Sequence, residues 1–282
     1  MIKRILLPLD DSEYSKKALE LAIWLAKHHD AELTGMVILD VPGIKHSFGS
    51  IPLGATYYTK LLSDSRLATA KERINGLIQS FNTECEKHSV RYANYKIEGV
   101  PSDAILDASK YYDVMIVGKR TFFEFDSEGT DGQSFEKLLD YSITPVIAVP
   151  KELNLEKHTK EARKYLIMFD ASIPSCRALQ RFAQMAATGN IELKLFMSHD
   201  DEDYRNHELN QAKELLNAHG FEKVTTEGSD IDIKKLFTPE EMKNYDGVVL
   251  GSHSKSTIAT FFTGSFTRYV IENSKRVVFV GQ

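Results

Sequence analysis

Residues 246–281, DGVVLGSHSKSTIATFFTGSFTRYVIENSKRVVFVG, place an apolar strand before a loop, a helix and a second apolar strand. The first strand ends at Gly251, Ser254 follows after two residues, and Gly264 and Ser265 come nine residues later at the head of the helix. Glycine allows tight turns that bring backbone N–H groups close to an anion, and a helix N-terminus turns its positive dipole end the same way. The stretch therefore predicts an α/β unit with a phosphate site at its loop.

A plainer interpretation of the same residues stays open. In it the glycines only make turns and Ser265 only caps the helix that it precedes. A sparse glycine pattern has low specificity, so the spacing alone does not decide between the two interpretations.

An internal repeat divides the chain. A shift of 160 residues superposes residues 4–33 on residues 164–193 without a gap, and the identities include Asp10 with Asp170 and Ser12 with Ser172. At the other end of each half, a shift of 131 aligns VIAVP with VVFVG. Such clustered identities predict two copies of one domain.

Each half alternates apolar strands with helical patterns. RILLPL is typical of a strand buried on both faces, and a helix follows over 13–29 with Ser12 suited to cap it. We expect a further amphipathic helix over 69–87, preceded by an insertion over 41–60 that could form a lid or a dimer element. Strands that alternate with helices predict two tandem, doubly wound, five-stranded parallel-sheet domains of Rossmann-like type. The predicted domains are 1–150 and 164–282, joined by a charged linker over 151–163.

Composition excludes several classes of protein. The 282 residues carry a net charge of −5, and their basic residues are dispersed, so neither nucleic acid nor a membrane surface is an expected partner. We find no signal peptide and no apolar run of membrane-spanning length. Cys85 and Cys176 have no metal-type spacing, which favours a reduced, cytoplasmic location.

The chain resembles a tandem universal stress protein. The resemblance rests on ILLPLDDSEYSKKALELA, on GVPSDAIL before the fourth strand, and on a VG-loop-S-helix pattern that ends in PVIAVP. It implies an adenine nucleotide alpha hydrolase-like fold with strand order 3-2-1-4-5, and it implies ATP as the ligand, alone or with Mg²⁺. In this family the pattern Gly, two residues, Gly, nine residues, Gly and then Ser or Thr is associated with ATP.

The two halves keep that pattern to different degrees. The second half keeps the spacing, with Ser254 in place of the second glycine. The first half has Thr121 at that place, a longer loop, and Gln133 in place of the glycine before Ser134. The resemblance therefore implies a nucleotide site mainly in the second half, made by Asp170, Ser198, Gly251, Ser254, Gly264, Ser265 and Phe266. The weaker set in the first half is Asp10, Val41, Gly118, Thr121, Gln133 and Ser134.

Two of these residue groups have alternative roles. Asp10 and Asp170 end the first strand of each half, where a carboxylate can face a ligand or simply cap the next helix. Residues 198–208, SHDDEDYRNHE, contain metal-ligand residue types, but an acidic solvated loop is the favoured interpretation, and no metal is expected.

The expected function is a nucleotide-dependent signalling or regulatory module of the stress response. No catalytic set stands out, so an enzyme is not expected beyond slow ATP hydrolysis. Two alternatives remain: a nucleotide-free scaffold that binds protein or another small ligand, and a weak ATP-hydrolysing enzyme. Family members commonly dimerise through their last strands, so VIAVP and VVFVG are expected to pair as an intramolecular pseudo-dimer; a homodimer is a further arrangement that the sequence allows.

Overall fold

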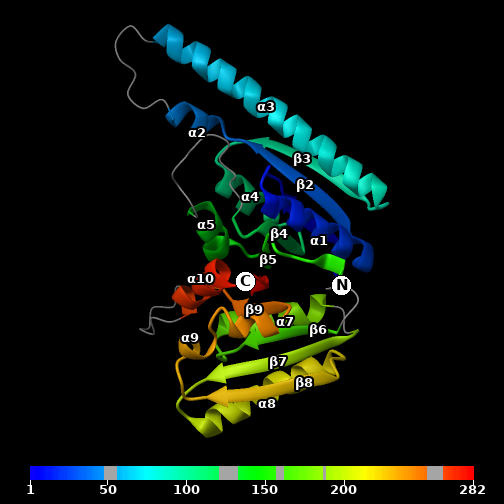
Figure 1. Cartoon of the computed structure of the whole chain (residues 1–282), viewed down its shortest axis with the longest axis vertical. Coiled ribbons are helices and arrows are strands. Elements are labelled where there is room, and N and C mark those ends of the chain that lie inside the picture. The colour runs from blue at the N-terminus through cyan, green and yellow to red at the C-terminus, as the bar shows by residue number, and fades with distance from the viewer. Residues whose placement is uncertain (48–55, 121–132, 157–161, 187–188, 253–262) are drawn as a thin grey trace. The chain divides into compact units, whose positions relative to one another are not determined.

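The structure is a computed structural model that describes residues 1–47, 56–120, 133–156, 162–186, 189–252 and 263–282. Strands and helices alternate through both halves of the chain, as predicted (Figure 1). The chain divides into two compact units. One consists of Ile2–Ile116 with Arg120–Ser142, and the other of Ile143–Gln282 with Val117–Lys119 and Met1.

The first half of the sequence contains five strands among its described elements. In chain order the elements are β1 (Arg4–Pro8), α1 (Glu13–His29), β2 (Glu32–Leu39), α2 (Val41–His46), α3 (Thr56–Lys87), β3 (Tyr92–Glu98), α4 (Pro101–Ser109), β4 (Val114–Gly118), α5 (Gln133–Tyr141) and β5 (Val146–Val149).

Strand β1 lies between β2 and β4, β3 pairs with β2, and all of these pairs are parallel. The strand is buried on both faces after its first residue, as the apolar run RILLPL predicts. Its start is held by Asp113, whose carboxylate accepts hydrogen bonds from the N–H groups of Lys3 (2.6 Å) and Arg4 (2.9 Å). Parallel pairing brings the carboxyl ends of these strands to one edge of the sheet.

The second half repeats the plan. Its elements are β6 (Arg163–Met168), α7 (Ile173–Met185), β7 (Ile191–Ser198), α8 (Glu202–Ala218), β8 (Lys223–Ser229), α9 (Ile233–Leu236), the 3₁₀ helix η1 (Glu241–Asn244), β9 (Gly247–Gly251), α10 (Thr263–Asn273) and β10 (Val277–Gly281). Strand β6 lies between β7 and β9, β8 pairs with β7, and β10 pairs with β9, all in parallel. The start of β6 is held in the same way as the start of β1, because the Asp246 carboxylate accepts the N–H of Lys164 at 2.8 Å.

The last strands of the two halves pair with each other. Strand β5 is antiparallel to β10, with Val278 opposite Ala148 and Phe279 opposite Ile147. The predicted pairing of VIAVP with VVFVG is therefore confirmed. It gives each strand a partner along an edge that would otherwise expose unpaired N–H and C=O groups.

Helix α1 shows why the repeated motif forms the same element twice. The Ser12 hydroxyl accepts the N–H of Ser15 at 3.1 Å, which caps the start of the helix. The helix ends at Asp30, whose backbone is left-handed with φ of 50°. In α7 the Ser172 hydroxyl accepts the N–H of Ser175 in the same way, at 3.4 Å.

Two sequence predictions about helices were wrong in extent. Helix α3 begins at Thr56, not near residue 69, and α2 occupies residues 41–46, so much of the predicted insertion is helical. The reason is that no proline or glycine interrupts the chain between Thr56 and Gly76. The predicted acidic loop over 198–208 is helical from Glu202, since Asp201 caps α8 by accepting the N–H of Tyr204 at 2.9 Å.

Apolar side chains fill the interior of both units, and β4, β5 and β10 are buried along their whole lengths. None of the helices in the described ranges has both the length and the apolar character that a bilayer crossing requires.

Candidate functional site

The candidate site lies at the carboxyl edge of the strands of the second half. Asp170 comes two residues after the end of β6, Ser198 is the last residue of β7, and Gly251 is the last residue of β9. In an open parallel sheet, ligands bind at this edge. The topology of the sheet thus brings Asp170, Ser198 and Gly251 to one edge.

The loop that carries Asp170 is held by hydrogen bonds. Oδ1 of Asp170 accepts the N–H of Ser172 at 3.0 Å, and the N–H of Asp170 donates to the Ser175 hydroxyl at 3.4 Å. Ala171 between them has a left-handed backbone with φ of 59°. Asp170 thus orders the residue that caps α7, whereas the cap itself is Ser172. Asp170 is also exposed, so it is accessible to a ligand.

Gly251 has a packing role at the same place. A Cβ atom at this position would lie 2.7 Å from the Ser175 nitrogen and 2.8 Å from the Pro174 carbonyl carbon. Only glycine lets the end of β9 approach the first turn of α7 this closely. The carbonyl of Gly251 also accepts a hydrogen bond from the Thr267 hydroxyl at 3.1 Å, which ties the end of β9 to α10.

The predicted phosphate loop is described only at its two ends. Ser254 lies outside the described residues, and Gly264 and Ser265 belong to the first turn of α10, which begins at Thr263 rather than near Phe266. The Phe266 side chain is buried and stacks on Tyr269, with ring centroids 6.2 Å apart. Its ring thus packs inside the protein, so that only its backbone N–H, in the first turn of a helix, is suited to an anion.

Ser198 is engaged with a neighbouring loop. Its hydroxyl donates a hydrogen bond to the carbonyl of Ile231 at 2.7 Å. The oxygen keeps its capacity to accept a hydrogen bond, for example from an adenine amino group.

Two aromatic side chains that follow β7 were not predicted as site residues. His199 and Tyr204 lie with ring centroids 4.7 Å apart at an interplanar angle of 49°. Burial raises the pKa of the Tyr204 hydroxyl, and the negative charges of Glu208 and Asp170 raise it further. Aromatic rings suit a purine base, and the signal was missed because residues 198–208 were interpreted as an acidic loop.

The equivalent carboxylate in the first half has a different environment. Asp10 is only 3% exposed, and its Oδ1 accepts both the N–H of Ser12 at 3.0 Å and the Ser12 hydroxyl at 2.6 Å. The two aspartates thus share sequence context and backbone role but differ in accessibility. Asp10 is enclosed, whereas Asp170 faces solvent.

The remaining first-half residues are spread over several elements. Val41 is the half-buried first residue of α2, and Gly118 is the buried last residue of β4. Thr121 lies outside the described residues, while Gln133 and Ser134 are in the first turn of α5.

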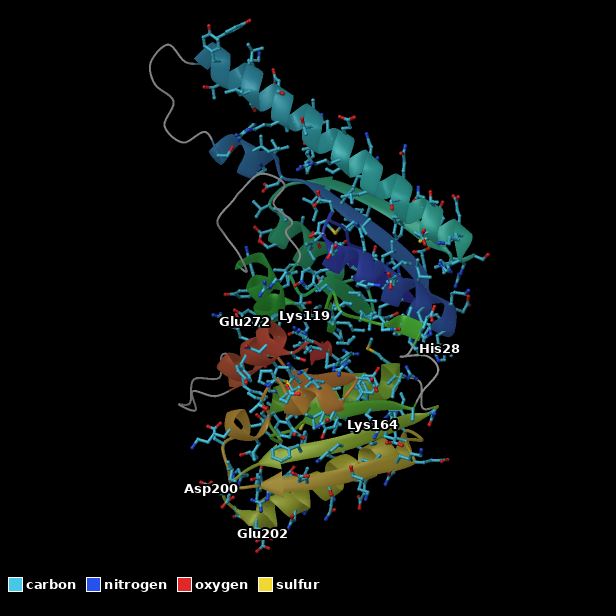
Figure 2. The ribbon with its side chains drawn as sticks, in the orientation of Figure 1. His28, Lys119, Lys164, Asp200, Glu202 and Glu272 are labelled. Carbon is cyan, nitrogen blue, oxygen red and sulfur yellow. The ribbon has the colours of Figure 1, made fainter. Side chains whose placement is uncertain are left out.

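Lys119, the residue after Gly118, is buried within the second unit. Its Nζ donates a hydrogen bond to the carbonyl of Ser274, just after the end of α10, at 2.7 Å (Figure 2). Burial lowers the pKa of the Lys119 ammonium from 10.5 to about 7. Lys119, beside Gly118, thus donates its hydrogen bond to a backbone carbonyl and is not placed to bind a phosphate.

No group of three or more His, Cys, Asp and Glu side chains within the described parts of the chain could hold a metal ion. Asp200 and Glu202 lie at the start of α8, where acidic side chains favour the helix N-terminus (Figure 2).

Known proteins place this fold in a family. The model of the universal stress protein family matches residues 1–150 and again 161–280. A universal stress protein from Synechocystis sp. is 22% identical over 289 residues, with 97% of each chain covered. Among solved structures, a universal stress protein from Archaeoglobus fulgidus covers 99% of the chain and 98% of its own with 19% identity and a TM-score of 0.65. A putative universal stress protein from Pseudomonas aeruginosa covers 99% and 92%, with 13% identity and a TM-score of 0.55. Because the family model matches both halves, the chain belongs to the universal stress protein family, with two tandem domains.

Proposed function

We propose that the second half binds an adenine nucleotide, foremost ATP, at the carboxyl edge of β6, β7 and β9, and that the chain acts as a nucleotide-dependent regulatory module in the cytoplasm. One observation carries the proposal. Of the two equivalent aspartates at strand ends, Asp170 is exposed while Asp10 is enclosed. An exposed carboxylate at the carboxyl edge of a parallel sheet can contact a ligand, even though its Oδ1 also accepts the N–H of Ser172.

The chemistry of the edge fits a nucleotide. The first turn of α10 offers backbone N–H groups, including that of Phe266, which suit a phosphate. Asp170 can accept hydrogen bonds from ribose hydroxyls or an adenine amino group, or contact Mg²⁺ carried by the phosphates. His199 and Tyr204 offer aromatic surface for a base.

The role of Asp170 has a direct test. The Asp170→Asn variant is expected to bind ATP about tenfold more weakly, because it loses a charge-assisted hydrogen bond of roughly 1.5 kcal/mol. Asp200→Asn, which removes an exposed carboxylate on the loop after β7, is the matched control and should keep the wild-type affinity. The measurement is titration calorimetry with ATP and Mg²⁺; equal affinity of the two variants would remove Asp170 from the site.

A further inference from the structure

Helix α10 joins the candidate nucleotide site to a residue from the first half of the chain. Its first turn, which begins at Thr263, offers the backbone N–H groups that suit a phosphate, and its last residue is Asn273. Just beyond that end, the Ser274 carbonyl accepts the hydrogen bond from Nζ of Lys119 at 2.7 Å (Figure 2). The 11 residues of the helix span about 16 Å, so Lys119 lies one helix length from the site.

The backbone fixes Lys119 at this place. Its N–H donates to the Val149 carbonyl at the end of β5, at 2.9 Å, and β5 pairs with β10, the element that follows α10. Lys119 and α10 belong to the same compact unit. In the second half, Ser252 makes the equivalent backbone hydrogen bond to Gly281, but its side chain has no amine. Of these two residues, only Lys119 can therefore bring a positive charge to the end of a helix.

The charge on Lys119 is sensitive to its surroundings. The residue is only 9% exposed, and burial lowers the pKa of its ammonium from 10.5 to about 7. Within the described residues, the charge that opposes this shift is that of Glu152, whose carboxylate also lies 3.9 Å from Nζ of Lys275. Near neutral pH, a change in the electrostatic potential at Lys119 therefore changes the fraction of chains that carry this proton.

We propose that Lys119 couples the nucleotide site to pH, because a proton on its Nζ strengthens the binding of an anionic nucleotide at the other end of α10. This inference rests on the nucleotide site proposed above. An ammonium suits the C-terminal end of a helix, as an anion suits the N-terminal end. The negative charge of the nucleotide attracts the buried ammonium through the protein interior, where the effective dielectric constant is lower than in water. By linkage, the proton and the nucleotide then raise each other's affinity by the same factor.

Distance and charge set the size of the effect. The two net negative charges of a magnesium–ATP complex act on the ammonium over about 16 Å, and at an effective dielectric constant of about 40 they change the affinity about fivefold. The bound nucleotide raises the pKa of Lys119, so binding takes up a proton near neutral pH. The affinity is therefore highest below about pH 7, where Lys119 is already charged, and it falls by this factor as the pH rises through the pKa of the bound state.

Titration calorimetry of the full chain with ATP and Mg²⁺ from pH 6 to pH 9, at about 0.01 M ionic strength to limit screening, tests the coupling. The wild type is expected to bind ATP about fivefold more tightly than Lys119→Met at pH 6, and equally tightly at pH 9. Lys119→Arg keeps the charge but does not titrate in this range, so it should bind more tightly than Lys119→Met at every pH. The control Lys151→Met removes an exposed lysine after β5 and should follow the wild type.

Proton uptake is a readout that a purely structural role of Lys119 would not change. Titrations at pH 7.5 in two buffers of different ionisation enthalpy should show that the wild type takes up about 0.4 proton more per ATP than Lys119→Met does. Equal uptake by the two proteins, or the same ratio of their affinities at pH 6 and pH 9, would overturn the coupling and leave the nucleotide site in place. A wild-type chain that binds no ATP at any pH would instead overturn the proposed site, and the coupling with it.

Discussion

Replacement of Gly35 by valine is expected to lower the free energy of unfolding by about 3 kcal/mol, near the upper end of the usual cost of overpacking. Gly35 lies in the middle of β2, opposite Leu7 in the parallel pair, and it is buried. A Cβ atom here would lie 2.8 Å from two carbons of the Phe81 ring. That ring is 1% exposed and packs edge-on against Tyr92, so it has no free space to move into.

Urea unfolding followed by circular dichroism measures this loss. Gly76→Ala on α3 is the control, because a Cβ at Gly76 meets nothing within 4 Å, and alanine in a helix should stabilise by about 0.5–1 kcal/mol. Adding Phe81→Leu to Gly35→Val should restore part of the loss by vacating the ring's volume. A Gly35→Val protein with wild-type stability would show that α3 does not pack on β2 through Phe81.

Replacement of Lys119 by methionine is expected to raise the free energy of unfolding below pH 7. Above pH 7 it is expected to make the free energy of unfolding less dependent on pH. Burial lowers the pKa of Lys119 to about 7 in the folded protein, from 10.5, and the negative charge of Glu152 opposes only part of this shift. Below pH 7 the folded protein must therefore hold a charged, buried ammonium, at a cost of about 5 kcal/mol.

The direction of the pH dependence follows from the two pKa values. Between pH 7 and 10.5 the unfolded chain binds the lysine proton and the folded chain does not, so the free energy of unfolding rises with pH by up to about 1.4 kcal/mol per unit. Methionine removes the titration but also leaves the Ser274 carbonyl without this donor, which costs about 1–3 kcal/mol. The net expectation is a variant about 3 kcal/mol more stable than the wild type at pH 6.

Comparison of the two proteins across pH isolates this lysine from the other titrating groups. The exposed Lys151, which follows β5, supplies the control Lys151→Met, whose stability profile should parallel that of the wild type. A constant difference in stability between Lys119→Met and wild type from pH 6 to pH 10 would contradict a depressed pKa of Lys119.

Much of the architecture follows from short-range signals in the sequence. RILLPL predicts a strand buried on both faces, and Ser12 and Ser172 predict the caps of α1 and α7, because each signal acts through neighbours within a few residues. The pairing of VIAVP with VVFVG, however, was predicted only through the family resemblance.

The interactions that the sequence did not predict have a common physical cause. The burial of Lys119 depends on Ser274, 155 residues away, and a lysine after a strand-end glycine carries no sign of that partner. The influence of the Asp170 charge on the pKa of Tyr204 likewise depends on where α8 lies relative to β6. Only the tertiary fold brings such groups together, so a pattern of neighbouring residues could not predict these interactions.

The divergence of the two halves is visible in these same residues. In the first half, Asp10 is enclosed and Lys119 is bound to a backbone carbonyl. In the second half, Asp170 is exposed and the residue after the strand-end glycine is Ser252 rather than a lysine. On the basis of this asymmetry we propose one nucleotide site per chain rather than two.

Native mass spectrometry of the chain with ATP and Mg²⁺ tests this central proposal most directly. Gly264 and Gln133 occupy matched places in the first turns of α10 and α5, and tryptophan at either place would block a phosphate there. We expect one bound nucleotide in the wild type and in Gln133→Trp, and none in a folded Gly264→Trp. Two nucleotides per chain, none in the wild type, or unchanged binding in Gly264→Trp would contradict it.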